Sequence, residues 1–438
     1  MQKIIAHIDM NSYFATCEQQ DHPEWRGLPV GVCEHLGGII IAASVEAKRW
    51  GIKTGTPVWE ARRLYPKIIL TKTHPDRYRY YTSRFLKVFA DYTDKVEKYS
   101  IDEAFLDLTE VCNVRGMIDG KLRRLDPWQE AQEIIKEIKL RMKTEVGDYI
   151  TCSAGVSYSK LVAKIASDLR KPDGLVVVRP QDKFALYDKL ELTDVPGIGN
   201  RMQKQLNNLG IYTLKELRDY PESQLVAKFG IAGKHLYSMG QLEGSWKENF
   251  EEQTDSKSMG HMYTIAQEFR QQRVLRPVLY KLSEMVGARL RANQYVGDNV
   301  FVHLHNPTGL CLSRGRKIGR MVDDGREIYK EAIFAIFQML KRDNLSWQDI
   351  ENQVYLVGVT VSGLVKKLNQ DNLFSQQFKS ERSAGLVEAL DKINTKYDDF
   401  TVARVPAFLA RDIIRDSVGF GRMKEFGTTF MGSGRANH

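Results

Sequence analysis

Two carboxylates stand side by side in an otherwise apolar stretch of this chain. Residues 98–109 read KYSIDEAFLDLT, whose β-branched and aromatic side chains are typical of a strand, with Asp102 and Glu103 in its middle. Because neighbouring residues of a strand point to opposite faces, one of the two acids must share a face with apolar side chains. An acid held there needs a partner, and this requirement constrains both the fold and the chemistry.

The length and charge of the chain narrow the class of protein. Its 438 residues exceed a single hydrophobic core, so several domains are expected. The 64 Lys and Arg against 55 Asp and Glu leave a net charge of +9, which favours a polyanionic partner such as nucleic acid. No stretch resembles a signal peptide or a membrane span, which predicts a cytoplasmic protein without a membrane partner.

The cysteines and histidines carry weaker signals. The five cysteines are scattered and form no CxxC, which indicates reduced thiols rather than a disulfide frame or a zinc site. His303 and His305 share one face of a predicted strand, but the sequence places no third ligand beside them. We therefore interpret the pair as surface histidines and not as a metal site.

A third carboxylate ends another apolar strand near the N-terminus. Residues 1–9 read as a strand that stops at Asp9, and a helix follows from about Ser12, where free N–H groups can bind a phosphate. Lys160 begins a helix after a second strand and is predicted to reach a phosphate from another side.

Three carboxylates from two strands would repel one another unless divalent cations lay between them. Oxygen ligands of this kind suit Mg²⁺. Two such ions about 4 Å apart can activate a hydroxyl and stabilise a leaving pyrophosphate. The pattern of acids therefore predicts nucleotidyl transfer.

Four motifs follow in order: HIDMNSYFATCE, SIDEAFLDLT, GVSYSKLVAKIASDLRKPDG and DVPGIGNRMQKQLNNLGI. Over roughly residues 1–363 they resemble the Y-family of translesion DNA polymerases. The resemblance implies a template-directed DNA polymerase of low fidelity, acting in translesion synthesis, DNA damage tolerance and SOS mutagenesis. Val45 and Lys48 stand where DinB-like members have Tyr and Arg, so the chain resembles the UmuC-like branch more.

The resemblance also implies an α+β, multidomain right-hand architecture with a helix-hairpin-helix thumb and an α/β little finger. The expected segments are palm 1–18, fingers 19–74, palm 75–172, thumb 173–240, linker 241–255, little finger 256–365 and a C-terminal tail 366–438.

By motif matching, the resemblance assigns roles to residues around the acids. Asp9, Asp102 and Glu103 would be the catalytic ligands of two Mg²⁺ ions, with the Met10 carbonyl completing one shell. The amides of Asn11, Ser12, Tyr13 and Phe14 would cradle the dNTP triphosphate, and Lys160 would neutralise it.

Three further nucleotide contacts follow from the same matching. Phe14 matches the steric gate, because a ring under the sugar leaves no room for a 2′-hydroxyl. Ser44 would belong to a roof of small residues, Ala42 to Val45, over the nascent base pair. Lys48 either contacts phosphate or is a solvated helix residue.

Binding of primer-template DNA is expected at two places. The PGIG turn, with Pro196, Gly197 and Gly199, presents backbone amides that suit phosphate contact. Residues 256–365 hold 15 Lys and Arg against 10 Asp and Glu, a surplus of 5, and Arg314, Arg316 and Lys317 lie on a strand-like segment there. The alternative for that segment is an edge strand protected by its charges.

Partner proteins are predicted from the tail and from the branch. Residues 370–374 read QDNLF and resemble the peptide by which bacterial polymerases bind the sliding clamp, with Gln370, Leu373 and Phe374 as its diagnostic residues. The UmuC-like reading adds a UmuD-like accessory subunit as a candidate partner.

Two other function classes compete with the polymerase. A palm-type nucleotide cyclase would use the same acids, although it needs neither a helix-hairpin-helix nor a basic C-terminal domain. A non-catalytic DNA-binding or clamp-binding scaffold would need no acids, yet all three are present.

Overall fold

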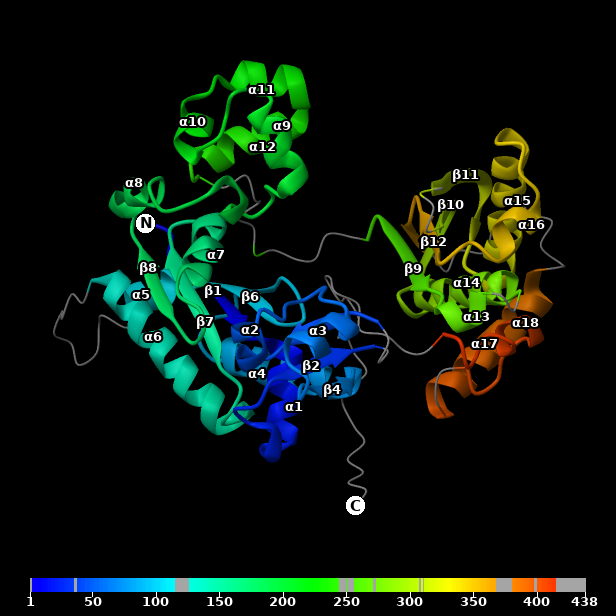
Figure 1. Cartoon of the computed structure of the whole chain (residues 1–438), viewed down its shortest axis with the longest axis horizontal. Helices are drawn as coiled ribbons and strands as arrows, with labels where there is room; N and C mark the ends of the chain where they lie inside the picture. The colour runs from blue at the N-terminus through cyan, green and yellow to red at the C-terminus, as the bar shows by residue number, and fades with distance from the viewer. Residues whose placement is uncertain are drawn as a thin grey trace. The chain divides into compact units, whose positions relative to one another are not determined.

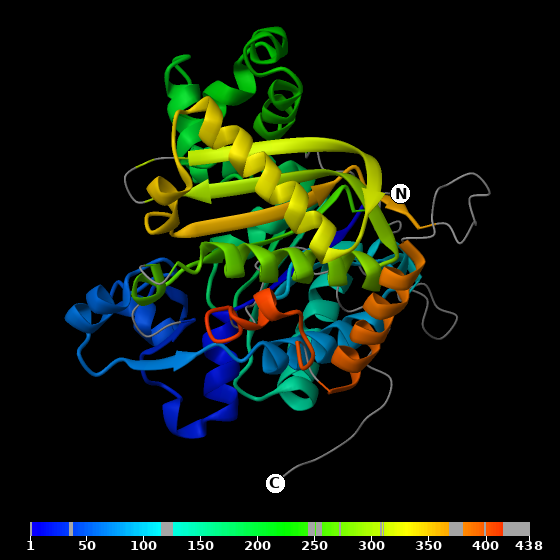
Figure 2. The same ribbon diagram turned by 90° about the vertical axis from the view of Figure 1, so that its right-hand side faces the viewer.

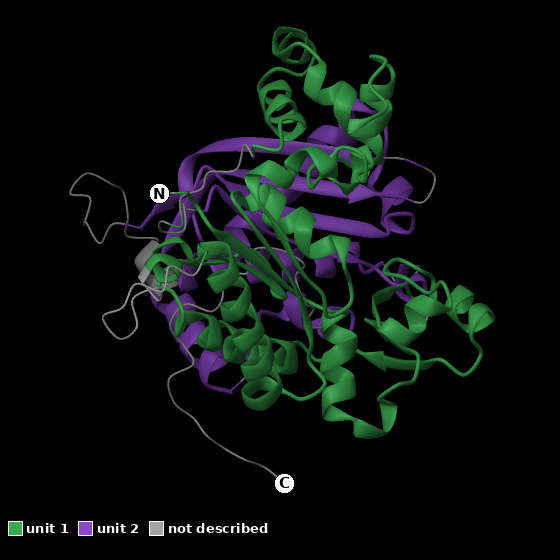
Figure 3. Cartoon of the chain, turned by 90° about the vertical axis from the view of Figure 1, so that its left-hand side faces the viewer, with its two compact units in different colours: residues 1–252, 417–438 green, residues 253–416 purple. Residues whose placement is uncertain are grey.

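The computed structural model of the chain describes residues 2–34, 38–114, 126–243, 250, 256–270, 273–306, 309, 311–367, 380–397 and 400–414. It divides into two compact units, residues 1–252 with 417–438 and residues 253–416 (Figures 1 and 3). The division falls within the predicted linker. In the described part of the chain, no helix has the length and apolarity that crossing a membrane requires.

A five-stranded sheet lies at the centre of the first unit, in the order β5-β6-β1-β7-β8. Its middle strand, β1 (Ile5–Met10), pairs antiparallel with both neighbours. Both faces of the strand are covered, which accounts for its nearly continuous apolar sequence. The other strands are β5 (Val96–Lys98), β6 (Glu103–Asp107), β7 (Cys152–Ser157) and β8 (Leu175–Val178).

Helices cover the two faces of this sheet. Ile4, Ala6 and Ile8 join a core with the apolar stripes of α4 and α6. Ile5 and Phe105 face the other way and contact Ala163 of α7. The helices of this region are α1 (Tyr13–Asp21), α4 (Pro75–Ala90), α5 (Thr109–Val114), α6 (Pro127–Arg141) and α7 (Lys160–Leu169).

Residues 98–109 are not the single strand that their composition predicts. β5 ends at Lys98 and β6 begins at Glu103, so Asp102 lies in the turn of a hairpin. The amides of Tyr99 and Ser100 donate to the Glu103 carbonyl at 3.1 and 3.2 Å and close this turn. Both acids therefore stand at an end of the sheet instead of within its interior.

The predicted fingers segment is a small layer of its own. Its sheet has the order β3-β2-β4, in which β2 and β3 form the expected antiparallel pair. A separate apolar cluster, which includes Ile40, Ile52 and Ala61, holds the helices against the sheet. The elements are β2 (Val30–Cys33), β3 (Ile40–Ala43), α2 (Val45–Arg49), α3 (Val58–Leu64) and β4 (Ile69–Lys72).

A cluster of short helices forms the predicted thumb. Leucines at helical spacing, among them Leu206, Leu214 and Leu225, share one core that continues onto α7. Thr213 caps α10 by accepting from the Glu216 amide, while the Glu216 carboxylate accepts from the Thr213 amide. The helices are α8 (Lys183–Leu186), α9 (Asn200–Asn207), α10 (Leu214–Asp219), α11 (Glu222–Phe229) and α12 (Ile231–Gly240).

The second unit is an antiparallel sheet with two long helices on one face (Figure 2). The strand order is β11-β10-β12-β9, and alternate residues such as Val300 and Val302 face the helices. The elements are β9 (Ser258–Thr264), α13 (Gln267–Arg270), α14 (Leu275–Ala292), β10 (Tyr295–His305), β11 (Cys311–Val322), α15 (Gly325–Arg342), α16 (Trp347–Glu351), β12 (Leu356–Ser362) and β13 (Val365–Lys366).

The C-terminal part of the chain extends this unit, a departure from the expected boundary at residue 365. Helices α17 (Ser380–Tyr397) and α18 (Val405–Phe408) belong to the same compact unit. Ala410, Ile413 and Ile414 are buried in its core, and the Lys281 ammonium donates to the Ile414 carbonyl at 2.8 Å. Residues 410–414 therefore anchor part of the tail in the core of this unit.

A charged cluster holds this anchor in place. The Arg404 guanidinium donates to Glu284 at 2.7 Å and to Asp324, the N-cap of α15, at 2.8 Å. Burial raises the pKa of Glu284, although the charge of Arg404 opposes the rise. Without Arg404, two partly buried carboxylates would face each other.

We expect Arg404→Gln to loosen residues 400–414 by about 2 kcal/mol, since hydrogen bonds to charged groups are lost there. Amide exchange in this segment, followed by mass spectrometry, should become about thirtyfold faster. Arg411→Gln, which removes an exposed pair with Asp412 and a contact of the guanidinium with the exposed Phe408 ring, is the matched control and should change little. Equal exchange in the two variants would contradict the anchoring role.

Candidate active site

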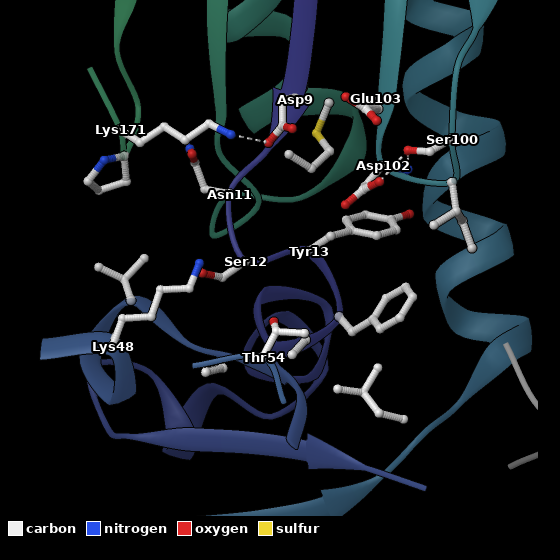
Figure 4. A pocket seen from close by; sticks show the side chains of 18 of the residues that line it. Asp9, Asn11, Ser12, Tyr13, Lys48, Thr54, Ser100, Asp102, Glu103 and Lys171 are labelled. Atoms are coloured by element: carbon white, nitrogen blue, oxygen red, sulfur yellow. Dashed lines mark hydrogen bonds and ion pairs between the residues drawn. The ribbon is translucent and has the colours of Figure 1, made fainter. Parts of the chain in front are cut away.

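One open cleft of the first unit, with a volume of about 960 Å³, contains all three predicted carboxylates (Figure 4). The β1–β6 ladder sets Asp9 opposite Glu103, and the Met10 amide donates to the Asp102 carbonyl at 2.9 Å. Backbone pairing therefore fixes the main-chain positions of the three acids. The same cleft is lined by Met10, Asn11, Ser12, Tyr13, Phe14, Ile41, Ala42, Ala43, Val45, Lys48, Arg49, Thr54, Tyr99, Ser100, Ile101, Lys171 and Pro172.

Each acid is turned to a different partner. Asp9 pairs with the Lys171 ammonium at 3.1 Å, and Asp102 accepts from the Ser100 hydroxyl. Glu103 pairs with Lys164 and accepts from the His7 ring at 2.9 Å. Across the described residues, the three carboxylates do not form a group whose ligand atoms all lie within 4.8 Å of one another. They share one cleft, but they do not meet at one point as expected.

The electrostatics of the acids differ accordingly. Burial raises the pKa of Asp9, against the opposing charge of Lys171. Burial also raises the pKa of Asp102, and the neighbouring charge of Glu103 adds to the rise. Burial alone would raise the pKa of Glu103, but the His7 hydrogen bond and the Lys164 charge outweigh it and lower the pKa to about 2. Two carboxylates thus lack full charge compensation, as a cation site requires.

The structure does not bring Lys160 to the cleft. Its side chain is 2% exposed, its ammonium pairs with Glu97, and it lies 4.3 Å from the centre of the Phe250 ring. Lys160 is the first residue of α7, which packs on β7, β1 and β8. Lys160 is therefore corrected to an internal ion-pairing residue.

Lys171 is the cleft lysine that sequence reasoning missed. It comes after α7, at the end of the motif GVSYSKLVAKIASDLRKPDG, and it lines the cleft beside Asp9 (Figure 4). Although burial opposes the effect, the charges of Asp9 and Asp168 raise its pKa and keep it cationic. The sequence signal that could have pointed to Lys171 is a lysine that directly follows a helix and precedes a proline.

The start of α1 has the features of an anion site. Ser12 adopts a left-handed backbone, φ 50° and ψ 43°, and its buried hydroxyl has no hydrogen-bond partner in the described part of the chain. The Asn11 amide already donates to the Thr151 carbonyl, and the Tyr13 hydroxyl donates to the Tyr78 carbonyl. The Asn11 amide is therefore removed from the expected cradle, whereas Ser12 remains.

Phe14 reaches the cleft from the first turn of α1. Its ring stacks on Tyr78 with 4.3 Å between ring centres and 11° between planes. The side chain is almost fully buried, so it is both part of the core and part of the cleft wall. This packing fixes the ring in one position.

The fingers layer contributes the opposite wall. Ala42, Ala43 and Val45 line the cleft, but Ser44 does not. Its hydroxyl accepts from the Ala47 amide as the N-cap of α2, so the expected contact to nucleotide is corrected to helix capping. Lys48 does line the cleft, where burial and the charge of Lys171 lower its pKa.

Further cleft residues were not foreseen. Arg49 and Thr54 also line it, and neither carried a motif signal. His7 and Lys164, which do not line the cleft, bind the Glu103 carboxylate. A polar His7 inside the apolar strand KIIAHIDM was a usable signal, because a buried imidazole needs partners, here Glu103 and the Ser167 hydroxyl.

The expected DNA contacts fall into two groups. Gly197, at φ +104°, and Gly199 are exposed at the turn before α9, next to Pro196. Arg314 and Arg316 do share a strand face, but it is the face covered by helices. Arg316 pairs with Glu331 at 3.3 Å and stacks on Phe334, whereas Lys317 points to the open face and is 77% exposed.

The residues of the predicted clamp-binding peptide, Gln370, Leu373 and Phe374, lie outside the described residues.

Family models match most of the chain. The impB/mucB/samB family covers residues 8–168, the C-terminal domain of that family covers residues 256–373, and the DNA polymerase-iota thumb domain covers residues 193–241.

Curated relatives and a solved structure agree with these matches. DNA polymerase IV of Pelotomaculum thermopropionicum is 32% identical over 94% of this chain and 97% of its own. DNA polymerase IV of Moorella thermoacetica is 33% identical over 93% and 96%, and DNA polymerase IV 1 of Bacillus subtilis 30% over 90% and 91%. A solved Y-family DNA polymerase chimera superposes with a TM-score of 0.67 at 26% identity, covering 83% of this chain and 99% of that one.

These relatives correct the branch. They are DNA polymerase IV proteins, of the DinB branch, so the predicted preference for the UmuC-like branch is wrong. Val45 and Lys48 are substitutions within the cleft and do not mark a branch. By its family models, its relatives and its fold, the chain belongs to the Y-family of DNA polymerases and is a translesion DNA polymerase of the DNA polymerase IV type.

Proposed function

We propose that this polymerase joins a dNTP to a primer 3′-hydroxyl with two Mg²⁺ ions held by Asp9, Asp102, Glu103 and the Met10 carbonyl. The observation that carries the proposal is the placement of three carboxylates in one cleft by the β1–β6 ladder. Their oxygen chemistry suits Mg²⁺, and the family typically uses divalent metal. When bound, the ions supply charge stabilisation for the attacking and leaving oxygens.

The acids must exchange partners to do this. Lys171 and Lys164 now supply the counter-charges of Asp9 and Glu103. Burial raises the pKa values of Asp9 and Asp102, so a cation beside them would stabilise their anionic forms. His7 holds Glu103 in the anionic form throughout.

The triphosphate would lie between the start of α1 and two lysines. Ser12 lines the cleft, its buried hydroxyl has no hydrogen-bond partner in the described part of the chain, and the N-terminus of α1 favours negative charge. Lys171 and Lys48 add positive charge from opposite walls. In this proposal the leaving pyrophosphate would lie beside these positive groups.

The sugar and base would occupy the rest of the cleft. Phe14 forms the floor for the sugar and would exclude a 2′-hydroxyl, while Ala42 and Ala43 leave room above the base. Small side chains there tolerate a distorted template base, which suits lesion bypass. A nucleotide cyclase would have no use for this wall, nor for the thumb turn at Gly197.

We further propose contacts to DNA and to a clamp. Pro196, Gly197 and Gly199 would contact a phosphate through the backbone, and Lys317 would contribute salt-sensitive binding from the open sheet face. The QDNLF peptide with Gln370, Leu373 and Phe374 would bind the bacterial sliding clamp. The UmuD-like subunit loses its support because the relatives belong to the DinB branch.

Primer extension on a damaged template tests the catalytic assignment. We expect Asp102→Asn and Glu103→Gln to lower the rate on the order of 10³-fold, and removal of Mg²⁺ by a chelator to abolish extension. Asp148→Asn, an exposed carboxylate paired with Arg26 outside the cleft, is the matched control. Extension that survives in the acid variants would remove the proposal, and nucleotide turnover without template would favour a cyclase.

A pair of lysine variants separates the two predicted phosphate contacts. We expect Lys171→Met to raise the KM for dNTP about tenfold or more, since a charge beside Asp9 is lost. Lys160→Met should keep the KM within about twofold and lower the melting temperature instead, because Glu97 loses its partner. Steady-state kinetics and thermal unfolding measure both effects, and the reverse pattern would restore Lys160 to the site.

The sugar gate is best tested without emptying the core. Phe14→Ala would cost about 3–5 kcal/mol of stability because the ring is buried, so Phe14→Leu is the better variant. We expect it to raise ribonucleotide incorporation about tenfold or more, as the clash with the 2′-hydroxyl is relieved. Phe89→Leu, in the same core but away from the cleft, is the control, and unchanged sugar selectivity in Phe14→Leu would exclude the gate.

A further inference from the structure

Three metal-binding side chains meet on the open face of the sheet in the second unit. His303 and His305 lie two residues apart on β10, and Cys311 begins β11 directly opposite His305. One ligand atom from each residue lies within 4.8 Å of the other two. The β10–β11 hairpin thus supplies the third ligand that the sequence did not place beside the histidines.

The surroundings of the group suit a ligand set rather than a packed core. The two imidazole rings are 4.5 Å apart between centres, and Cys311 is exposed while the other four cysteines are buried. The Ser313 hydroxyl bonds to Nδ1 of His303, which orients that ring as an outer partner does in metal sites. Gly358 lies opposite His303 on β12, and the Met262 side chain packs beside it.

The geometry of the group is compatible with metal binding. The thiol is accessible to solvent and can lose its proton when a metal binds. A tetrahedral ion needs ligand atoms about 3.3–3.7 Å apart, which small side-chain rotations from the present positions would reach.

We propose that His303, His305 and Cys311 form a Zn²⁺ site with one coordination position open to solvent. Two imidazoles and a thiolate match borderline-soft Zn²⁺ and not Mg²⁺, which prefers the oxygen ligands of the cleft. These residues lie in the other compact unit from the carboxylate cleft, on the sheet face that also carries Lys317. Zn²⁺ there would clamp the end of the β10–β11 hairpin and stabilise the folded unit.

The test uses the untagged full chain, stripped of metal and kept in excess Mg²⁺ so that the carboxylates are occupied. Titration with Zn²⁺ against a chromophoric chelator should give one tight site per chain. Co²⁺ in its place should give a thiolate-to-cobalt charge-transfer absorption. Cys311→Ser and His305→Ala should weaken Zn²⁺ binding about 100-fold or more, and Cys311→Ser should abolish the thiolate absorption.

His235→Ala, an exposed histidine in the other unit, is the matched control and should bind Zn²⁺ as the wild type does. A readout on the wild-type chain guards against misfolded variants: Zn²⁺ should slow alkylation of Cys311 by iodoacetamide at least tenfold. The proposal is overturned by the absence of tight binding, by a Co²⁺ complex without thiolate absorption, or by Cys311 that alkylates equally fast with and without Zn²⁺.

Discussion

The ladder between β1 and β6 is the constraint on which the site depends. Ile5 to Asp9 pair in register with Asp107 to Glu103, and β1 is held from its other side by β7. A shift of one residue would turn Asp9 to the opposite face and separate it from the hairpin turn. The apolar residues of β1 pack on both faces of the sheet, so the core itself prevents that shift. The position of the acids is therefore a consequence of hydrophobic packing.

Charge is the second organising principle of the cleft. Three carboxylates and two lysines share a partly desolvated space, where unpaired charges are costly. The chain meets this cost unevenly, with full compensation at Glu103 and incomplete compensation at Asp9 and Asp102. Because the charges of the cleft are not fully paired, added cations or a triphosphate can interact with them favourably. A site with every charge paired would be more stable but less able to bind either.

The second unit is completed by a segment far along the chain. In residues 400–414, which read FTVARVPAFLARDII, Ala410, Ile413 and Ile414 enter the core, while Arg404 and Lys281 bind the surrounding oxygens. The helix-covered face of the sheet also contains an ion pair, between Arg316 and Glu331. The open face keeps its polar groups outward, where Lys317 and the His303, His305 and Cys311 group are accessible.

The sequence by itself determined the family and the α+β class, and it predicted the three acids and the gate ring, because each stands in a contiguous motif with local periodicity. It could not determine which lysine enters the cleft: Lys160 and Lys171 both flank α7, and only the packing of that helix on the sheet decides which ammonium faces Asp9. For the same reason the sequence did not show that Ser44 caps α2 or that Arg316 pairs with Glu331 of the helix that covers the sheet. Cys311 meets His303 and His305 only through the pairing of two strands. Contacts between distant segments depend on how layers pack, and that information does not lie in any single motif.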